Sequence, residues 1–282
     1  MKDFNSQEIF ISKLKENVNS NRSSLVGEKF NIISMMGEVK YEVEVKKLIG
    51  EGGSSMVYEV LVDDSYPPLK KMIMKEFYPN YNEEEIVAER NPINRLELYF
   101  DADDIQGEQR VKKDRDKFID AYNKHIRILE MDPYLEGKIV RPYRVEIDSS
   151  YLYSLYEVDT ATSVDKYYNL DLIRIVDILK QTADILVHLH NNDIIYMDLK
   201  PANILYDYNN GNVKLFDFDA AVDLNELEYI NEFSMPNERA FIPPELRFIT
   251  DIANRKDFFI TEEIDVYMLG VTFFFTNGQI SY

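Results

Sequence analysis

The 282-residue sequence contains no cysteine, so disulfide bonds and thiol-based metal or catalytic sites are excluded. Basic residues are also few: 32 lysines and arginines are outnumbered by 51 aspartates and glutamates, which gives a formal net charge of −19. This balance argues against a nucleic-acid-binding protein, because contacts to phosphates require a basic face. The acidic surface is typical of a soluble protein, and a preference for basic partners is the alternative interpretation.

Long hydrophobic runs are lacking as well. The N-terminal stretch MKDFNSQEIFISKLKENV has charged residues inside each apolar segment and has no signal-peptide core. The longest apolar runs, such as VYMLGVTFFF near the C-terminus, are too short to span a bilayer. We therefore expect a soluble protein without a membrane segment, and the absence of cysteine is compatible with a cytoplasmic location.

Hydrophobic periodicity separates a β-rich part of the chain from a helical part. Residues 1–26 are typical of a short amphipathic helix followed by a polar stretch. From Lys29 the apolar residues alternate, which predicts an antiparallel sheet made from KFNIISMM, KYEVEVKKLI, MVYEVLV and LKKMIMKEFY. Residues 80–116 are polar and weakly periodic, so we expect an insertion or loop there with some helix.

The second half of the chain is mainly helical in pattern. The stretch DKFIDAYNKHIRILEM predicts a helix, and KIVRPYRVEI and SYLYSLYEV predict two further strands. Residues 171–190 place apolar side chains at intervals of three and four, as in an amphipathic helix. Two short strands, NILYDY and NVKLFDF, flank a turn at residues 209–212.

A glycine-rich connection between two predicted strands, Gly50-Glu51-Gly52-Gly53, has a composition suited to binding phosphate. Glycine lets the backbone approach phosphate oxygens closely and direct its N–H groups at them. Such a loop on its own is more often a plain turn. The strand MIMK, one strand further on, ends in Lys75, which by itself would be a surface lysine on an edge strand. Together the two features favour a phosphate site.

Two motifs in the helical part carry the strongest signal. They are DLKPAN at 198–203 and, a short strand later, Asp217-Phe218-Asp219. The sequence here resembles the protein kinase family, whose catalytic loop reads His-Arg-Asp-Leu-Lys-Pro-x-Asn and whose metal motif reads Asp-Phe-Gly. The glycine loop, Lys75, Pro244-Glu245 and Asp265 also occur in the family's order, so the resemblance extends over about residues 41–282.

The resemblance implies an α+β fold of two lobes, a small antiparallel β-sheet N-lobe and a helical C-lobe. We expect an N-terminal extension over 1–40, the N-lobe over 41–158 with an insertion at about 80–116, and the C-lobe over 159–282. The C-lobe would end at the family's central αF-type helix and so be incomplete. Either a partner or the missing C-terminal helices would then cover the exposed apolar face of the last helix.

The resemblance also implies ATP and Mg²⁺ as cofactors, with defined roles for the motif residues. Asp198 would orient the substrate hydroxyl and accept its proton, and Lys200 would contact the γ-phosphate. Asn203 and Asp217 would supply oxygen ligands to Mg²⁺, a hard cation. Lys75 would hold the α- and β-phosphates.

The adenine is expected at the connector between the lobes. Tyr156 corresponds to the gatekeeper, and the backbone of Glu157 and Asp159 would pair with the edge of the base. The remaining nucleotide contacts implied by the family pattern are Gly50, Gly52, Gly53, Val57 and Leu205.

Several positions depart from the family pattern. Ser55 stands in place of the third glycine of the loop, and Met197 replaces the arginine before the catalytic aspartate. That arginine normally receives a phosphate on the activation loop, so we expect this chain not to need one. Asp219 replaces the glycine of the metal motif, which reduces backbone freedom and adds a carboxylate near the metal positions.

Two further departures bear on catalysis. The family pairs its strand lysine with a glutamate from the first long helix, but that position is Ala121 here, and Asp120 is the nearest acid. In the substrate-facing loop the family's threonine has become Glu238. We hypothesise that Glu238 pairs with Lys200, either in place of the threonine or as a restraint on the loop.

The sequence therefore favours a protein kinase that transfers phosphate to serine or threonine. Lys200 favours a protein substrate over the small molecules used by aminoglycoside-type phosphotransferases, and it favours Ser/Thr over Tyr acceptors. The alternative is a pseudokinase, an ATP-binding or scaffolding module, which Ala121, Glu238 and the missing helices favour. The three histidines, His125, His188 and His190, have no partners at metal spacing and are expected to be structural.

Overall fold

The structure, a computed structural model, divides into two compact units. Unit 1 comprises residues 1–116 and 145–155, and unit 2 comprises 117–144 and 156–282. The residues it describes are 23–33, 39–51, 55–63, 70–79, 87–101, 105–147, 151–158, 160–167, 170–226, 241–244 and 260–277. The helix expected within residues 1–26 lies almost wholly outside this set, and the predicted domain boundaries stay predictions.

Unit 1 is built on an antiparallel sheet, as the alternating pattern predicts. Its strand order is β1-β2-β3-β4-β8-β7. The strands are β1 (Lys29–Ile33), β2 (Val39–Glu51), β3 (Ser55–Asp63), β4 (Lys70–Phe77), β7 (Arg141–Ile147) and β8 (Leu152–Glu157). Inside β3 the burial alternates residue by residue, so one face is in the core. The expected α+β class with a sheet-based N-terminal part is confirmed.

The region between β4 and the first described helix contains a hairpin that the sequence analysis did not predict. Strands β5 (Val87–Arg90) and β6 (Leu98–Asp101) pair antiparallel. Helix α2 (Ile105–Met131) then begins eleven residues before the predicted DKFIDAYNKHIRILEM segment. The four-residue strands are too short for alternation to distinguish them from loop, and the first turns of α2 are too polar to show a helical stripe.

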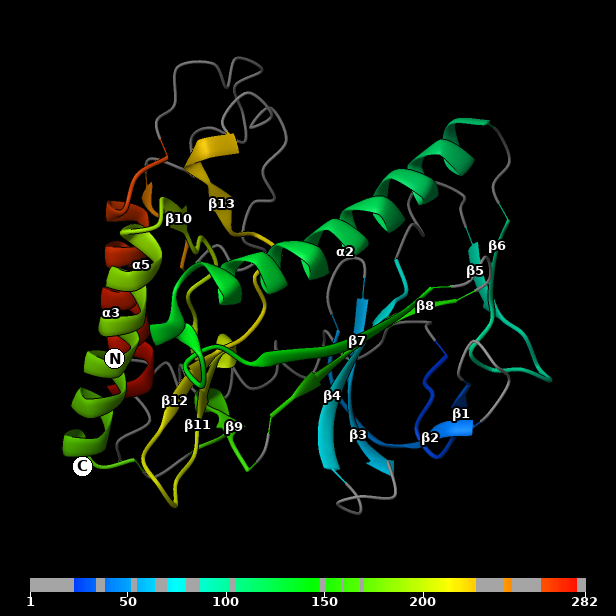
Figure 1. Cartoon of the computed structure of the whole chain (residues 1–282), viewed down its shortest axis with the longest axis horizontal. Coiled ribbons are helices and arrows are strands. Elements are labelled where there is room, and N and C mark those ends of the chain that lie inside the picture. The colour runs from blue at the N-terminus through cyan, green and yellow to red at the C-terminus, as the bar shows by residue number, and fades with distance from the viewer. Residues whose placement is uncertain are drawn as a thin grey trace, which may run out of the picture. The chain divides into compact units, whose positions relative to one another are not determined.

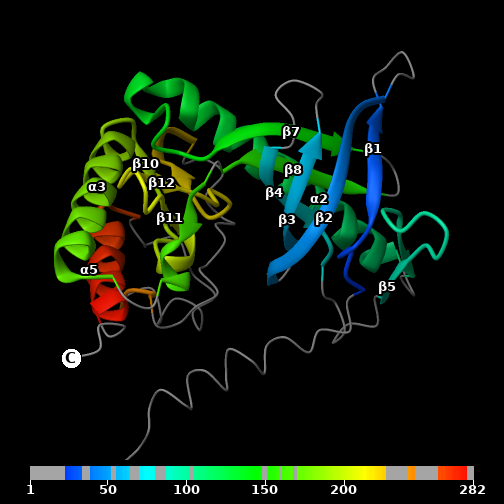
Figure 2. The same cartoon turned by 90° about the horizontal axis from the view of Figure 1, so that it is seen from below.

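Unit 2 is mainly helical, and its two long helices α3 (Leu172–His190) and α5 (Glu263–Asn277) lie side by side in both views (Figures 1 and 2). Asp171 caps α3 by accepting a hydrogen bond from the Arg174 backbone N–H at 2.8 Å. Its short strands form two small sheets, β12-β11-β9 and β10-β13. They are β9 (Thr162–Ser163), β10 (Ile194–Ile195), β11 (Ile204–Tyr206), β12 (Val213–Leu215) and β13 (Val222–Asp223).

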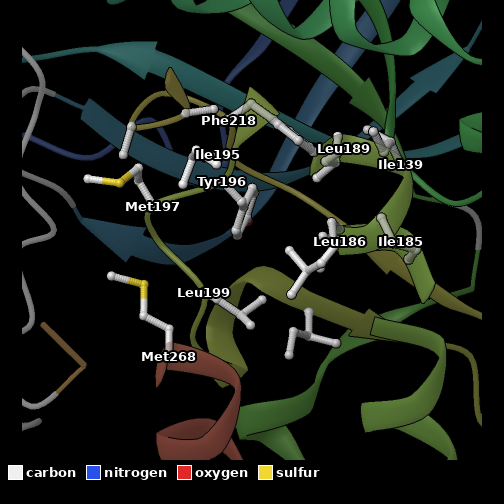
Figure 3. Packing of buried hydrophobic residues seen from close by; sticks show 14 of the residues in the cluster. Ile139, Ile185, Leu186, Leu189, Ile195, Tyr196, Met197, Leu199, Phe218 and Met268 are labelled. Atoms are coloured by element: carbon white, nitrogen blue, oxygen red, sulfur yellow. The ribbon is translucent and has the colours of Figure 1, made fainter. Parts of the chain in front are cut away.

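The core of unit 2 encloses the predicted catalytic loop. Figure 3 shows Leu186 and Leu189 from α3, Met268 from α5 and the loop residues Tyr196, Met197 and Leu199 around one apolar centre. Tyr196, Met197 and Leu199 are each 0% exposed. The loop that bears Asp198 is therefore held by hydrophobic packing on both sides of that residue.

The apolar face of α5 is only partly covered in the part of the chain that the structure describes. Val266 and Phe274, two turns apart, are 61% and 76% exposed. The expectation of an exposed apolar face on this helix agrees with these two side chains. That a partner or further C-terminal helices cover this face of α5 stays a prediction. No helix among the described residues has both the length and the hydrophobicity needed to cross a membrane.

Truncation of Leu189 tests the packing around the loop. Leu189 is 0% exposed, whereas Val187 on the same helix is 54% exposed. We expect Leu189→Ala to lower the free energy of unfolding by about 2–5 kcal/mol, because it leaves a cavity beside the loop. Val187→Ala, the control, should change it by less than about 0.5 kcal/mol. Urea unfolding followed by circular dichroism measures both, and equal effects of the two variants would contradict the assignment.

Candidate active site

One buried carboxylate holds the backbone of the predicted catalytic loop just before Asp198. Asp265, at the start of α5, is 0% exposed, and its two oxygens accept the backbone N–H groups of Tyr196 and Met197, each at 2.8 Å. Asp265 therefore braces the backbone just before Asp198. His190 contributes its Nε2 to the same carboxylate at 2.9 Å. His190 is thus part of the support of the loop, in line with its expected structural role.

The three residues predicted to act on the transferred phosphate lie together. Lys200 Nζ is 3.1 Å from Asp198 Oδ2, and each side chain is 14% exposed. Asn203 donates from its amide nitrogen to the same oxygen at 2.9 Å and to the Asp198 carbonyl at 2.8 Å. This contact turns the amide oxygen of Asn203 away from the carboxylate of Asp198.

The surroundings of Asp198 bring the pKa of its carboxyl group closer to neutral pH. Burial raises the pKa of Asp198 to about 6; Lys200 opposes this shift, and the negative charge of Asp217 adds to it. A carboxylate with this pKa is ionised at neutral pH and still accepts a proton readily. Two partly buried carboxylates whose charges repel each other also suit a cation, so the oxygen donors present fit Mg²⁺.

Asp217 is held in place through its neighbours in the chain. The Phe216 backbone N–H donates to the Asn203 carbonyl at 3.0 Å, and the Tyr196 hydroxyl donates to the Phe216 carbonyl. Phe218 is 1% exposed, and its ring centroid lies 5.0 Å from that of Tyr196. The metal motif is therefore packed against the catalytic loop from both sides of Asp217.

Backbone strain is concentrated next to the two carboxylates. Met197 has a φ of 68° and Asp217 a φ of 64°, both in the left-handed region that residues other than glycine rarely adopt. Such conformations persist only where the surroundings hold them. Here they are held by hydrogen bonds that the Met197 N–H donates to Asp265 and the Phe216 N–H, beside Asp217, donates to the Asn203 carbonyl. Among the described residues other than glycine, Asp193 is the remaining one with a positive φ, so two of these three positions lie at or next to a predicted site residue.

Helix α2 binds the segment that follows the metal motif. Lys124 donates to the Ala221 carbonyl at 2.7 Å, and Arg127 forms an exposed ion pair with Glu226 at 2.6 Å. Burial lowers the pKa of Lys124, and the charge of Asp219 opposes that shift. Sequence reasoning missed Lys124, because a single lysine within a helical pattern carries no signal of its contact.

His125 lies one residue further along α2. Its Nε2 donates to the Val140 carbonyl at 2.7 Å, and its ring centroid lies 4.8 Å from that of Phe218. The predicted gatekeeper, Tyr156, is 4% exposed and contacts the rings of His125 and Phe216. His125 is therefore a packed core histidine, as expected, and it joins α2 to the metal motif.

Three of the residues predicted to contact the nucleotide lie opposite one another on neighbouring strands of unit 1. In the sheet register, Gly50 pairs with Val57, and Val57 pairs with Lys75. Directly paired residues on neighbouring strands share a face, so Val57 and Lys75 point to the same side of the sheet. Lys75 is 5% exposed and β4 lies between β3 and β8, so the alternative of a surface lysine on an edge strand does not apply.

The structure describes some of the remaining predicted site residues and leaves others outside its described ranges. Leu205 lies on β11 and is 3% exposed, and Glu157 ends β8. Ala121 is half-buried on α2, and Asp120 beside it is exposed. The predicted residues that lie outside the described part of the chain are Gly52, Gly53, Asp159, Glu238 and Glu245. The proposed pairing of Glu238 with Lys200 therefore stays a hypothesis.

Neutralising Asp198 should stabilise the fold. The folded-state pKa of about 6 lies above the value of 3.8 expected for the unfolded chain, so the folded state loses stability as the pH rises from about 4 to 6, and the full penalty is present above pH 6. We expect Asp198→Asn to raise the free energy of unfolding by about 1–3 kcal/mol at pH 8. The gain should vanish below about pH 4, where native Asp198 is protonated in both states.

Urea unfolding at several pH values measures this effect. The control is Asp184→Asn, which removes an exposed carboxylate from α3 and should change stability by less than about 0.5 kcal/mol. A stabilisation by Asp198→Asn that is as large at pH 4 as at pH 8 would show that the buried charge is not its cause.

Removing the amine of Lys124 should loosen the segment after the metal motif. In Lys124→Met we expect hydrogen exchange at the Ala221 and Leu224 amides to accelerate by about tenfold or more, because a part-buried charged hydrogen bond is lost. Arg127→Met removes an exposed ion pair and should accelerate exchange by less than about fivefold. Mass-spectrometric hydrogen exchange compares the variants, and equal rates in both would remove any special role for Lys124.

Comparison with known proteins agrees with this arrangement. The sequence profile of the protein kinase domain matches residues 107–279, which is more than half of the chain. R436 of Acanthamoeba polyphaga mimivirus, provisionally named a serine/threonine-protein kinase, is 29% identical over 170 residues, covering 57% of this chain and 55% of the relative. The dual specificity protein kinase Ttk of Danio rerio is 26% identical over 238 residues, covering 83% of this chain and 20% of the relative.

A third relative is named as an adapter. The STE20-related kinase adapter protein strd-1 of Caenorhabditis elegans is 35% identical over 98 residues, covering 34% of this chain and 24% of the relative. The chain thus spans 55% of the length of R436 and a smaller share of the other two. Because the protein kinase domain profile covers more than half of its residues, the chain belongs to the protein kinase family.

Proposed function

We propose that this chain is an active protein kinase that transfers the γ-phosphate of Mg-ATP to serine or threonine hydroxyls of a protein substrate. The observation that carries the proposal is the geometry around Asp198. Lys200 and Asn203 both bind its carboxylate, within about 3 Å of one oxygen, and its pKa is raised to about 6. Phosphoryl transfer needs positioned charges of this kind and little covalent chemistry from the protein.

Each residue has a distinct task in this proposal. Asp198 orients the substrate hydroxyl and takes up its proton as the oxygen attacks phosphorus, and Lys200 stabilises the charge on the transferred phosphate. Asn203 and Asp217 would hold Mg²⁺, which when bound neutralises charge on the phosphates. The packing of Phe218 against Tyr196 holds the metal motif beside the loop that bears Asp198.

The nucleotide is assigned to the remaining predicted residues. Lys75 would bind the α- and β-phosphates, and the paired Gly50 and Val57 on the same row of the sheet would contact the nucleotide. In unit 2, Tyr156, Glu157 and Leu205 would line the position of the adenine, with Asp159 completing the connector. Gly52 and Gly53 stay part of this prediction.

The proposed specificity for serine and threonine acceptors is based on Lys200 and on the names of two similar proteins, R436 and Ttk. R436 is provisionally named a serine/threonine-protein kinase, whereas Ttk is named as dual specificity. Lys200, in direct contact with Asp198, has the residue type that the resemblance associates with Ser/Thr acceptors. A basic substrate would suit the net charge of −19. A cytoplasmic location and the absence of nucleic-acid and membrane partners remain part of the proposal.

The alternative function is a pseudokinase that binds partners with weak or no catalysis. Ala121 on α2 lacks the carboxylate that the family uses to pair its strand lysine, and strd-1 is named as a kinase adapter. In this reading the exposed Val266 and Phe274 of α5 would belong to an interaction surface. The intact contacts of Asp198 favour the enzyme.

A transfer assay separates the two functions. The chain is incubated with γ-labelled ATP, Mg²⁺ and a generic basic protein, and incorporation is compared between the natural chain and Asp198→Asn. We expect the variant to lose about 10²–10⁴-fold in rate, because it cannot accept the hydroxyl proton. Phosphoamino-acid analysis of the product should show phosphoserine and phosphothreonine, and phosphotyrosine would extend the specificity.

The control variant for the assay is Asp184→Asn, which should keep the natural rate because Asp184 is exposed on α3. Equal incorporation by the natural chain and Asp198→Asn would refute the role of Asp198. If the natural chain transfers no phosphate while Mg-ATP still raises its melting temperature, the pseudokinase is the correct function.

A further inference from the structure

A buried ion pair lies directly beside Lys75 in the chain. Glu76 and Arg90 have side chains that are 4% and 3% exposed. Arg90 Nη1 lies 2.8 Å from Glu76 Oε1, and Nη2 lies 3.0 Å from Oε2, so the two planar groups meet in a bidentate arrangement. This pair joins β4, the strand that carries Lys75, to β5 of the hairpin that the sequence analysis did not predict.

The carboxylate of Glu76 has one more partner. The Tyr58 hydroxyl donates to Glu76 Oε2 at 3.1 Å and accepts the Leu25 backbone N–H at 3.3 Å. Burial raises the pKa of Glu76, while the hydrogen bonds and charge of Arg90 oppose that shift. Compensation of the buried Glu76 charge thus depends on Arg90, because no other cation among the described residues is bonded to this carboxylate.

Arg90 also holds the segment that precedes β1. Its Nε donates to the Ser23 carbonyl at 2.9 Å, its Nη1 donates to the Arg95 carbonyl at 2.5 Å, and its guanidinium lies 5.0 Å from the centre of the Tyr78 ring. Tyr78 in turn donates to the Ala88 carbonyl at 3.3 Å. One guanidinium therefore ties together β4, the β5–β6 hairpin and the segment at Ser23.

Glu76 and Lys75 point to opposite faces of the sheet because successive side chains of a strand alternate. In the register, Glu76 pairs with Met56, and Lys75 pairs with Val57. Fixing the side chain of Glu76 on one face therefore fixes the backbone from which Lys75 extends on the other. Because β4 is paired on both edges, with β3 and with β8, the pair of Glu76 and Arg90 adds an anchor perpendicular to the sheet at the residue next to Lys75.

We propose that Arg90 is a positioning residue for Lys75, acting through the carboxylate of Glu76 on the opposite face of β4. The β5–β6 hairpin and the segment at Ser23 are then parts of the nucleotide-binding apparatus, because they hold Arg90 in place. This inference rests on the proposed function in one respect, the assignment of Lys75 to the phosphates of ATP. The orientation of Lys75 itself is measurable without nucleotide.

The test compares Arg90→Met with Arg95→Met. Arg95 lies in the same hairpin region and donates to the Ser24 carbonyl at 2.7 Å and to Ser23 Oγ at 3.0 Å, and its side chain is 38% exposed. It has no described bond to Glu76, so it controls for loss of a cation near Ser23. Arg90→Lys is the conservative variant, which keeps the charge and loses the bidentate contact.

The first readout is the rate at which an amine-reactive acetylating reagent modifies Lys75, followed by mass spectrometry. We expect Arg90→Met to raise that rate roughly three- to thirtyfold, Arg90→Lys to raise it less, and Arg95→Met to leave it unchanged. The rate at buried Lys124 in unit 2 reports on general unfolding and should stay constant. If Arg90→Met fails to fold, Tyr58→Phe, which removes a single hydrogen bond to Glu76, should still raise the rate at Lys75.

The second readout is the Mg-ATP concentration that gives half of the maximal thermal stabilisation. It should rise in Arg90→Met by roughly three- to thirtyfold and stay unchanged in Arg95→Met. Equal labelling of Lys75 in both arginine variants, or a rise at Lys124 as large as that at Lys75, would overturn the proposal. If Lys75→Met binds Mg-ATP as the natural chain does, the nucleotide role of Lys75 fails, while the labelling result still decides whether Arg90 positions it.

Discussion

The carboxylate of Asp265 is the contact on which the proposed active site depends. It is 0% exposed, and it satisfies two backbone N–H groups of a loop that would otherwise bury them without partners. Those bonds hold Met197 at a φ of 68°, an unfavourable conformation that turns the chain just before Asp198. The direction in which Asp198 points therefore follows from a residue on a helix more than sixty positions later in the sequence.

Two buried carboxylates in this protein show how partners decide what a buried charge does. Glu76 faces a bidentate guanidinium and a tyrosine hydroxyl, which oppose the rise in pKa that burial causes, and this carboxylate holds strands together. Asp198 has one ammonium and one amide, and the nearby charge of Asp217 acts against its ionisation. Incomplete compensation leaves the pKa of Asp198 at about 6, where a carboxylate can take part in proton transfer.

Much of the fold could be predicted from local sequence. The period-2 pattern of β2, β3 and β4 and the apolar spacing of α3 correspond to the observed strands and helix. The motif DLKPAN indicated that Asp198, Lys200 and Asn203 share one loop, and the structure shows them bonded to one another. The β5–β6 hairpin escaped prediction because its stability comes from Arg90 and its distant partners rather than from its own pattern.

Local sequence specifies which chemical groups are available and which segments form strands or helices, because these properties depend on neighbours within a few residues. The contact of Lys124 with the Ala221 carbonyl, the pairing of Arg90 with Glu76 and the burial that raises the pKa of Asp198 arise only in the folded chain. These outcomes depend on contacts between residues far apart in the chain and on exclusion of water. No local pattern encodes either, since both arise when the segments pack together.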